Sequence, residues 1–316
     1  MDPLSDVLRV VRLDAAYFYA VDASEPWSVE APPARRISPK LLPAVEHLIP
    51  YHVLLAGRCF GGLAGEEQVE MAPGDVIVFP HGDGHVMSSA RGMRTDPNDY
   101  GTPDRYPSAI VLGAGPPTAS FVCGFLGCDL RPFNPLLASL PRRMHMRGMS
   151  TAGLGGFTRQ VTEESRLGRA GAETVLTRLA ELMFIEVLRR YLDELAPGQV
   201  GWLAGLRDET VGPALALLHA RPGHDWTLAE LATGVASSRS KLAERFTLLV
   251  GQPPMQYLAQ WRMQVAANRL IESSAKVAAV GSEVGYDSEA AFSRAFKKAT
   301  GLAPGAWRAT RRTTPS

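Results

Sequence analysis

The sequence predicts a multidomain α+β protein, with an N-terminal domain of short β-strands and an all-α C-terminal domain. Residues 15–135 contain short apolar runs separated by clusters of Gly and Pro, the pattern of an all-β domain. From residue 135 the apolar residues step by three or four, as they do in helices. The last 90 residues contain one helix-turn-helix pattern twice. A chain of 316 residues has room for both domains.

Charge is divided unevenly along the chain. The whole chain has 33 Lys and Arg against 32 Asp and Glu, a net charge of +1. From residue 201 onward there are 14 basic and 9 acidic residues, or +5, whereas residues 1–200 carry 19 and 23, or −4. This division predicts a C-terminal domain that faces phosphates, attached to a domain that does not touch DNA.

The N-terminal residues predict a short amphipathic helix, because Leu4, Val7, Leu8 and Val11 lie at helical spacing. Acidic residues come early and no apolar core of secretory length follows, so we expect no signal peptide. No run approaches the roughly 18 apolar residues of a membrane span. The three cysteines fit a reducing compartment better than a disulfide framework. We therefore expect a cytoplasmic protein that does not bind membranes.

The β-rich region is expected to form a sandwich or a barrel, because many short strands and turns follow one another closely. Its predicted strands contain Tyr51–Leu55, Val69–Met71, Val76–Phe79, Ala109–Leu112 and Ala119–Cys123.

Two helices are expected after this region, over residues 153–169 and 173–195. Pro197 and Gly198 end the second helix and mark a linker. Its apolar stripe either packs on the β domain or contributes to a dimer, and the two interpretations are compatible. The stripe consists of Leu176, Leu179, Leu182, Met183, Val187, Tyr191 and Leu195.

The repeated pattern covers Thr227–Phe246 and Val277–Phe296. In each copy a short apolar helix meets a tight turn, and a Ser precedes a second helix with two buried apolar positions. A long helix over residues 256–273 joins the copies, so the spacing between them is fixed by a stiff element. Two second helices held in this way suit entry into successive major grooves, about 34 Å apart.

Residues 210–308 resemble the DNA-binding domain of the AraC/XylS family of bacterial transcription regulators. The residues that carry the resemblance are Trp226–Ala232, Gly251–Leu258, Trp261–Met263, Ala266–Ile271, Val284–Tyr286, Ala291–Lys298 and Gly301–Pro304. One departure lies in the first turn, where the family favours Gly followed by an apolar residue and this chain has Ala236 and Ser237. The first motif is therefore expected to be looser or differently angled.

Residues 74–89 resemble the second motif of cupin barrels, with His85 pointing into the barrel and Ser89 in place of the family's final Asn. Together the two resemblances imply a cupin-like effector-sensing domain over 1–150, linker and dimerisation helices over 151–200, and an AraC-type DNA-binding domain over 201–316. They also imply double-stranded promoter DNA, a second copy of the chain and RNA polymerase as partners.

By this resemblance, the second helix of each motif reads bases. Arg294 can present a two-pronged donor to guanine. Glu244 would accept from a cytosine amino group or pair with Arg245, unless it is merely a solvated residue. The expected DNA-binding residues are Arg239, Ser240, Lys241, Ala243, Glu244, Glu289, Ala290, Ser293, Arg294 and Lys298.

The N-terminal domain offers one candidate constellation, formed by His85 with Cys59, Cys123 and Cys128. It leaves open a small organic effector beside inert thiols, a thiol-based redox sensor and a closed zinc site. A redox sensor needs thiols that are partly exposed and near positive charge, a condition that Cys59 satisfies on paper by following Arg58. Cys123 and Cys128 would pair only if the chain turned between them.

The first cupin motif is absent, with only His47 and His52 near its place, so we expect a receptor and not an enzyme. An organic effector is the favoured occupant, in a pocket lined by the strands around Tyr51–Leu55 and Val76–Phe79.

Overall fold

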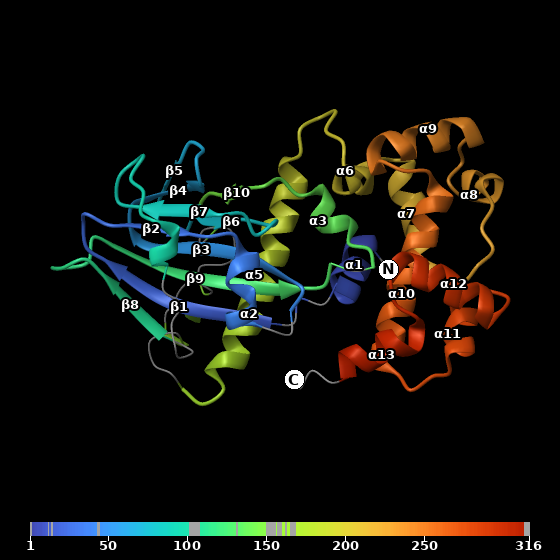
Figure 1. Ribbon diagram of the computed structural model, residues 1–316. Helices are drawn as coiled ribbons and strands as arrows, with labels where there is room; N and C mark the ends of the chain where they lie inside the picture. The colour runs from blue at the N-terminus through green and yellow to red at the C-terminus, as the bar shows by residue number, and fades with distance from the viewer. Residues whose placement is uncertain are drawn as a thin grey trace. The chain divides into compact units, whose positions relative to one another are not determined.

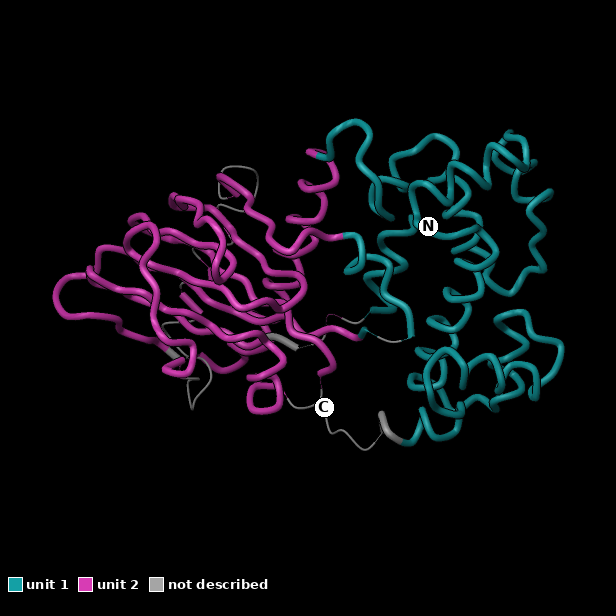
Figure 2. Tube along the Cα trace, turned by 45° about the horizontal axis from the view of Figure 1, so that its top comes forward, with its two compact units in different colours: residues 1–12, 130–139, 195–316 teal, residues 13–129, 140–194 magenta. Residues whose placement is uncertain are grey.

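The chain folds into two compact units, each of which collects segments that are distant in the sequence (Figure 2). The sheet unit comprises residues 13–129 and 140–194, and the helical unit comprises residues 1–12, 130–139 and 195–316. The computed structural model describes residues 2–11, 13, 15–42, 45–100, 108–130, 132–149, 156, 160–161, 163–164 and 169–312. The helix expected over 153–169 lies largely outside these residues.

The sheet unit contains ten described strands in two sheets (Figure 1). The six-stranded sheet has the order β10-β6-β3-β9-β1-β8, and the four-stranded sheet has the order β2-β7-β4-β5. The strands are β1 Ala15–Ala23, β2 Ser28–Ala31, β3 His47–Gly57, β4 Cys59–Leu63, β5 Val69–Met71, β6 Val76–Val78, β7 His85–Ser88, β8 Ser108–Leu112, β9 Ala119–Cys128 and β10 Met144–Met146. All five predicted strand regions are confirmed, as two sheets; the described strands do not close into one ring.

Apolar side chains from both sheets form the core of the sheet unit. Leu54, Ile77 and Phe121 come from the larger sheet, and Cys59 and Met87 from the smaller one. In the register of β3 and β9, Gly124 lies opposite Tyr51. A Cβ atom at Gly124 would lie 2.3 Å from the Tyr51 ring, so only glycine fits there.

Short helical segments complete the sheet unit, namely η1 Ala34–Arg36, α2 Ser38–Leu41 and η2 Pro97–Asp99. The long helix α5, Ala172–Glu194, packs on β1 and β10. Its buried residues include Leu176, Met183 and Val187 of the predicted stripe, whereas the Leu182 side chain is 48% exposed. Three of the seven stripe residues therefore belong to the core of this unit.

The helical unit holds the remaining described helices. They are α1 Pro3–Val11, α3 Pro135–Ser139, α6 Trp202–Arg207, α7 Val211–Ala220, α8 Leu228–Gly234, α9 Arg239–Val250, α10 Pro254–Glu272, α11 Val277–Glu283, α12 Glu289–Thr300 and α13 Pro304–Arg312. Helices α8 and α9 form the first helix-turn-helix pair, α11 and α12 form the second, and α10 runs between them (Figure 1). The predicted amphipathic N-terminal helix, the two motifs and the long joining helix are all present.

Two segments from early in the sequence pack onto α10. Gln264 and Asn268, which are 1% and 6% exposed, both donate side-chain hydrogen bonds to the Val10 carbonyl at the end of α1. The Gln264 side-chain oxygen also accepts from the Phe133 backbone N–H at 2.9 Å. The Phe133 ring meets Tyr257 edge-on, with centroids 5.4 Å apart. Residues 1–12 and 130–139 thus belong to the helical unit, whereas the sequence-based division followed chain order.

Candidate nucleic-acid interface and internal pocket

Side-chain caps mark the start of three of the four motif helices, α8, α9 and α12. Thr227 accepts from the Glu230 backbone N–H, Ser238 from that of Lys241, and Ser288 from that of Ala291, at 3.1–3.2 Å. Such caps satisfy N–H groups that have no partner within the helix. The second helices α9 and α12 end at Gly251 and Gly301, whose φ angles of 82° and 79° are left-handed.

The two motifs differ in their turns. The first turn places Ala236 at φ 50°, the one left-handed residue other than glycine within the described part of the chain, and the second places Gly285 at φ 84°. Both turns close with the same backbone hydrogen bond, Ser237 N–H to Ala232 O at 2.9 Å and Tyr286 N–H to Gly281 O at 3.0 Å. The first turn therefore closes with the same hydrogen bond as the second, but with a strained alanine in place of the glycine.

Replacing Ala236 with glycine is expected to stabilise the protein. A left-handed conformation costs a residue with a Cβ atom roughly 1–2 kcal/mol, and glycine's greater freedom when unfolded offsets about 0.5–1 kcal/mol of the gain. Because Ala236 is exposed and buries little, we expect the free energy of unfolding to rise by about 0.5–1 kcal/mol. Chemical denaturation measures this change in the free energy of unfolding.

Ala229→Gly is the matched control, because Ala229 is equally exposed but lies within helix α8. There glycine should lower the free energy of unfolding by about 1 kcal/mol. If both substitutions destabilise alike, the left-handed strain at Ala236 does not exist.

The second helix of each motif buries one face and exposes the other. Leu242, Phe246, Phe292 and Phe296 are fully buried, as expected. The expected DNA-binding residues lie on the opposite side, and all are exposed except Ala243 and Ser293, which are half-buried. Those exposed are Arg239, Ser240, Lys241, Glu244, Glu289, Ala290, Arg294 and Lys298.

Several basic side chains near these helices serve the fold. Arg245, the suggested partner of Glu244, instead donates to Asp208 at 2.8 Å. Burial raises the pKa of Asp208, but backbone N–H donors of α7 and the Arg245 guanidinium outweigh burial and lower it. Arg308 donates to the carbonyls of Leu270 and Ala275, tying α13 to α10.

A buried polar network fixes α10 against the helices before it. Trp202 donates from its indole nitrogen to the Tyr257 hydroxyl at 2.8 Å, and that hydroxyl lies 2.7 Å from His219 Nε2. The His219 ring stacks on Trp261 with centroids 3.9 Å apart. Burial lowers the pKa of His219 to about 3, so its ring is neutral. These contacts hold α10, the helix between the two motifs, rigidly against α6 and α7.

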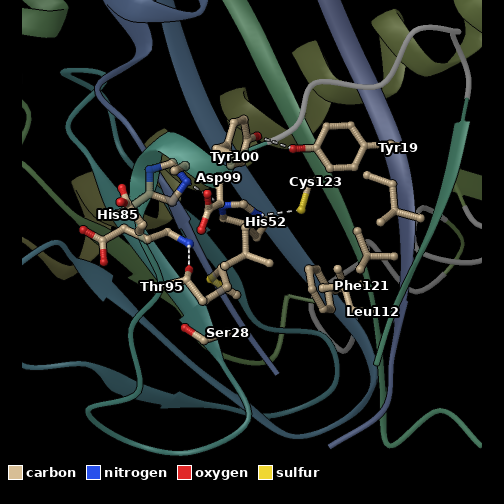
Figure 3. A pocket seen from close by; sticks show the side chains of 17 residues that line it. Tyr19, Ser28, His52, His85, Thr95, Asp99, Tyr100, Leu112, Phe121 and Cys123 are labelled. Carbon is tan, nitrogen blue, oxygen red and sulfur yellow. Dashed lines mark hydrogen bonds between the residues drawn. The ribbon is translucent and has the colours of Figure 1, made fainter. Parts of the chain in front are cut away.

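The sheet unit contains a cavity of about 470 Å³ that is partly open to solvent (Figure 3). Its wall is mostly apolar, with a group of hydrogen-bonded polar side chains on one side. Its lining consists of Tyr19, Val21, Ser28, Val29, Glu30, Ala31, His52, His85, Met87, Thr95, Asp96, Asp99, Tyr100, Ile110, Leu112, Phe121 and Cys123. This volume and this lining are typical of a site for a small molecule.

Comparison with known proteins supports an N-terminal cupin domain and a C-terminal helix-turn-helix domain. Residues 2–193 match a cupin family model, and residues 231–310 match a helix-turn-helix domain model. An AraC-like transcription regulator of Streptomyces antibioticus is 32% identical over 98% of each chain. The chain belongs to the AraC family of transcription regulators. A similar relative in Streptomyces lividans is 31% identical, again over 98% of each chain.

Further relatives of this AraC-type regulator include the HTH-type transcriptional regulator AlkR of Acinetobacter baylyi, which is 28% identical over 94% of this chain and 96% of its own. Among solved structures, the DNA-binding domain of AdpA in complex with a target DNA is 28% identical over 33% of this chain and 94% of that one, with a TM-score of 0.31. The regulator thus joins a cupin domain to an AraC-type DNA-binding domain.

The candidate cysteines of the regulator do not form one site. Cys123 and Cys128 lie in the unbroken strand β9, five residues apart, so their side chains point to opposite faces and cannot pair. The turn that their pairing would require does not occur. Cys123 lines the cavity, Cys59 belongs to the adjoining core, and Cys128 is buried elsewhere.

The chemical condition for a reactive thiol is also not met. Cys59 is fully buried, and burial together with the nearby Asp75 carboxylate raises its pKa to about 12. Burial raises the pKa of Cys123 and Cys128 as well. Among the residues that the structure describes, no group of three or more His, Cys, Asp or Glu is placed to hold a metal ion.

His52, which the sequence placed near the missing first cupin motif but not among the candidate site residues, lines the cavity. Its Nε2 lies 2.9 Å from His85 Nε2, and its Nδ1 lies 2.9 Å from Cys123 Sγ. The strand around Tyr51–Leu55 was expected to line the pocket and does so through His52, but Val76–Phe79 packs behind the wall, where Phe79 stacks on His85 at 4.2 Å. The signal that would have found His52 is strand alternation, which places it on the face opposite Tyr51 and Val53.

None of the helices within the described ranges combines the length and the apolar character that crossing a membrane requires.

Proposed function

We propose that the regulator is a homodimer whose cavity binds a small organic effector and whose helices α9 and α12 read adjacent major grooves of promoter DNA. The observation that carries the proposal is the pair of capped helices α9 and α12, whose polar faces are exposed. The helix between the two motifs, α10, is fixed by buried hydrogen bonds. The mostly apolar cavity and the buried thiols favour an organic effector over oxidation or zinc. Family membership favours RNA polymerase as the partner on DNA.

Selection of bound sequences from a random DNA pool tests the proposal. We expect an enriched site with two blocks about one helical turn apart, and affinity that falls steeply with salt. Failure to enrich any sequence, with binding equal for all DNA, would contradict it.

We assign the dimer contact to the face of α5 that the rest of the sheet unit leaves uncovered. Val175, Leu179 and Leu182 follow at spacings of four and three, so they share one helix face, and Leu182 is 48% exposed. Exposed apolar residues on a helix face are suited to a self-complementary two-fold contact. We propose that a second copy covers this face.

Leu182→Glu is expected to turn the dimer into a monomer, because it places a charge on that contact. Size-exclusion chromatography with light scattering measures the mass. Val200→Glu is the control, since Val200 is 64% exposed in a segment outside α5. A wild-type protein that is monomeric at tens of micromolar, with and without DNA, removes the assignment.

A further inference from the structure

The strand β2 turns an apolar face towards the cavity. Val29 of β2 lies opposite Met87 of β7, and both residues line the cavity. Because the side chains of a strand alternate between its faces, Ser28 and Glu30 point to the other face of this sheet. There the Glu30 carboxylate forms a two-pronged ion pair with Arg94. Glu30 therefore offers no free charge to a molecule inside the cavity.

The two other carboxylates of the described lining belong to the segment around η2. Asp96 caps η2 by accepting from the Asn98 backbone N–H at 2.8 Å. Asp96 and Asp99 are both exposed, so water solvates their charges. The described lining contains no Lys or Arg. The interior that this lining surrounds therefore offers no charged partner to an ion of either sign.

The imidazoles in the cavity wall are already engaged with groups of the protein. His85 Nδ1 lies 3.0 Å from the Asp83 carbonyl oxygen, and His85 Nε2 lies 2.9 Å from His52 Nε2. His52 Nδ1 lies 2.9 Å from Cys123 Sγ (Figure 3). Burial lowers the pKa of His85 to about 4 and holds that of His52 well below its usual value, so the pair is uncharged at neutral pH. Each ring nitrogen thus has a partner before any ligand enters.

The hydroxyl groups of the wall are engaged as well. The Tyr19 and Tyr100 hydroxyl oxygens lie 2.6 Å apart, facing each other in Figure 3. The Thr95 hydroxyl oxygen accepts from the Glu30 backbone N–H at 3.0 Å. The rest of the described lining is apolar and consists of Val21, Val29, Ala31, Met87, Ile110, Leu112 and Phe121. A ligand in this cavity therefore meets apolar surface and polar groups that are bonded to one another.

Such a wall discriminates by charge. An ion that enters the cavity loses its hydration and gains no ion pair in return, which is unfavourable for a carboxylate and for an ammonium group alike. An uncharged apolar molecule loses little hydration and buries its surface against the wall. The difference between these two cases grows with the depth at which the charged group is held.

We propose that the cavity selects an uncharged, mostly apolar organic molecule and excludes ionised molecules of the same shape. This proposal rests on the effector-binding function proposed above and names the chemical class of the effector.

The neutral dye N-phenyl-1-naphthylamine, whose fluorescence rises in apolar surroundings, tests the site on the full chain. Ile110→Trp should weaken dye binding roughly 10-fold or more, because the larger side chain fills part of the cavity that Ile110 lines. Val111→Trp is the matched control, since Val111 follows in the same strand β8, is 73% exposed and should leave dye binding unchanged. Circular dichroism shows that both variants are folded.

Three competitors with one carbon skeleton test the chemical class, namely 3-phenylpropanol, 3-phenylpropylamine and 3-phenylpropionate. At neutral pH the alcohol is uncharged, whereas the amine and the carboxylate are ionised. We expect the alcohol to displace the dye from the wild-type protein. Each ion should need a concentration roughly 100-fold higher or more, because its charge loses water without gaining a partner.

Displacement of the dye by either ion as readily as by the alcohol would overturn the proposed class, but would leave the cavity as an effector site. Absence of dye binding, or equal binding by the Ile110 and Val111 variants, would overturn the proposal and the effector-binding function with it. Sequence-selective DNA binding, measured on the same preparations, tests the remaining function of the regulator independently.

Discussion

Replacing Arg294 with alanine is expected to weaken binding of the regulator to its selected DNA site by roughly 5- to 150-fold. Arg294 lies exposed on the second turn of α12, on the side opposite the buried Phe292 and Phe296. An arginine that contacts a guanine with two hydrogen bonds contributes about 1–3 kcal/mol of discrimination. Fluorescence anisotropy with specific and random duplexes at fixed salt measures the loss.

The pattern of the loss distinguishes base reading from plain charge attraction. If Arg294 reads a base, affinity for random DNA should fall far less than affinity for the selected site. Arg178→Ala is the control, because Arg178 is an exposed arginine of the sheet unit that pairs with Glu181. Unchanged affinity of the Arg294 variant for the selected site would contradict the assignment of Arg294 as a residue that reads a base.

Replacing Gln264 with methionine is expected to lower the free energy of unfolding of the helical unit by about 1–3 kcal/mol, the cost of a buried donor left without its acceptor. Methionine fills the same volume but cannot accept from the Phe133 N–H. The Val10 carbonyl keeps its bond from Asn268, so a combined Gln264→Met and Asn268→Leu variant should lose more. Chemical denaturation measures both.

Gln256→Met is the matched control, since Gln256 is exposed on the same helix. It should change stability by no more than about 0.5 kcal/mol. Equal stability of the Gln264 and Gln256 variants would show that α1 and residues 130–139 do not pack on α10 in solution.

Local patterns predicted much of this molecule. Apolar spacing and the Ser before each second helix predicted both helix-turn-helix pairs. Short apolar runs separated by clusters of Gly and Pro predicted the strands. The unusual first turn was also visible, and its consequence is a strained Ala236. Each of these features depends on residues that are neighbours in the sequence.

Features that depend on distant residues escaped prediction. His52 becomes a site residue only because β3 pairs with β9 and brings it to Cys123, 71 positions away. The packing of Val10 on Gln264 joins residues 254 positions apart. Cys123 and Cys128 looked like a pair in the sequence. Both lie in the continuous strand β9, and because successive side chains alternate between its faces, the two thiols point to opposite faces.

Hydroxyl-radical footprinting of the full-length regulator on its selected site tests the central claim most directly, because it maps each contact along the DNA backbone. Two rigidly spaced recognition helices should protect, for each bound chain, two patches about 10 base pairs apart on one face of the duplex. Arg294→Ala should weaken the patch of the second motif more than that of the first. A single patch per chain, or two patches on opposite faces, would contradict the account.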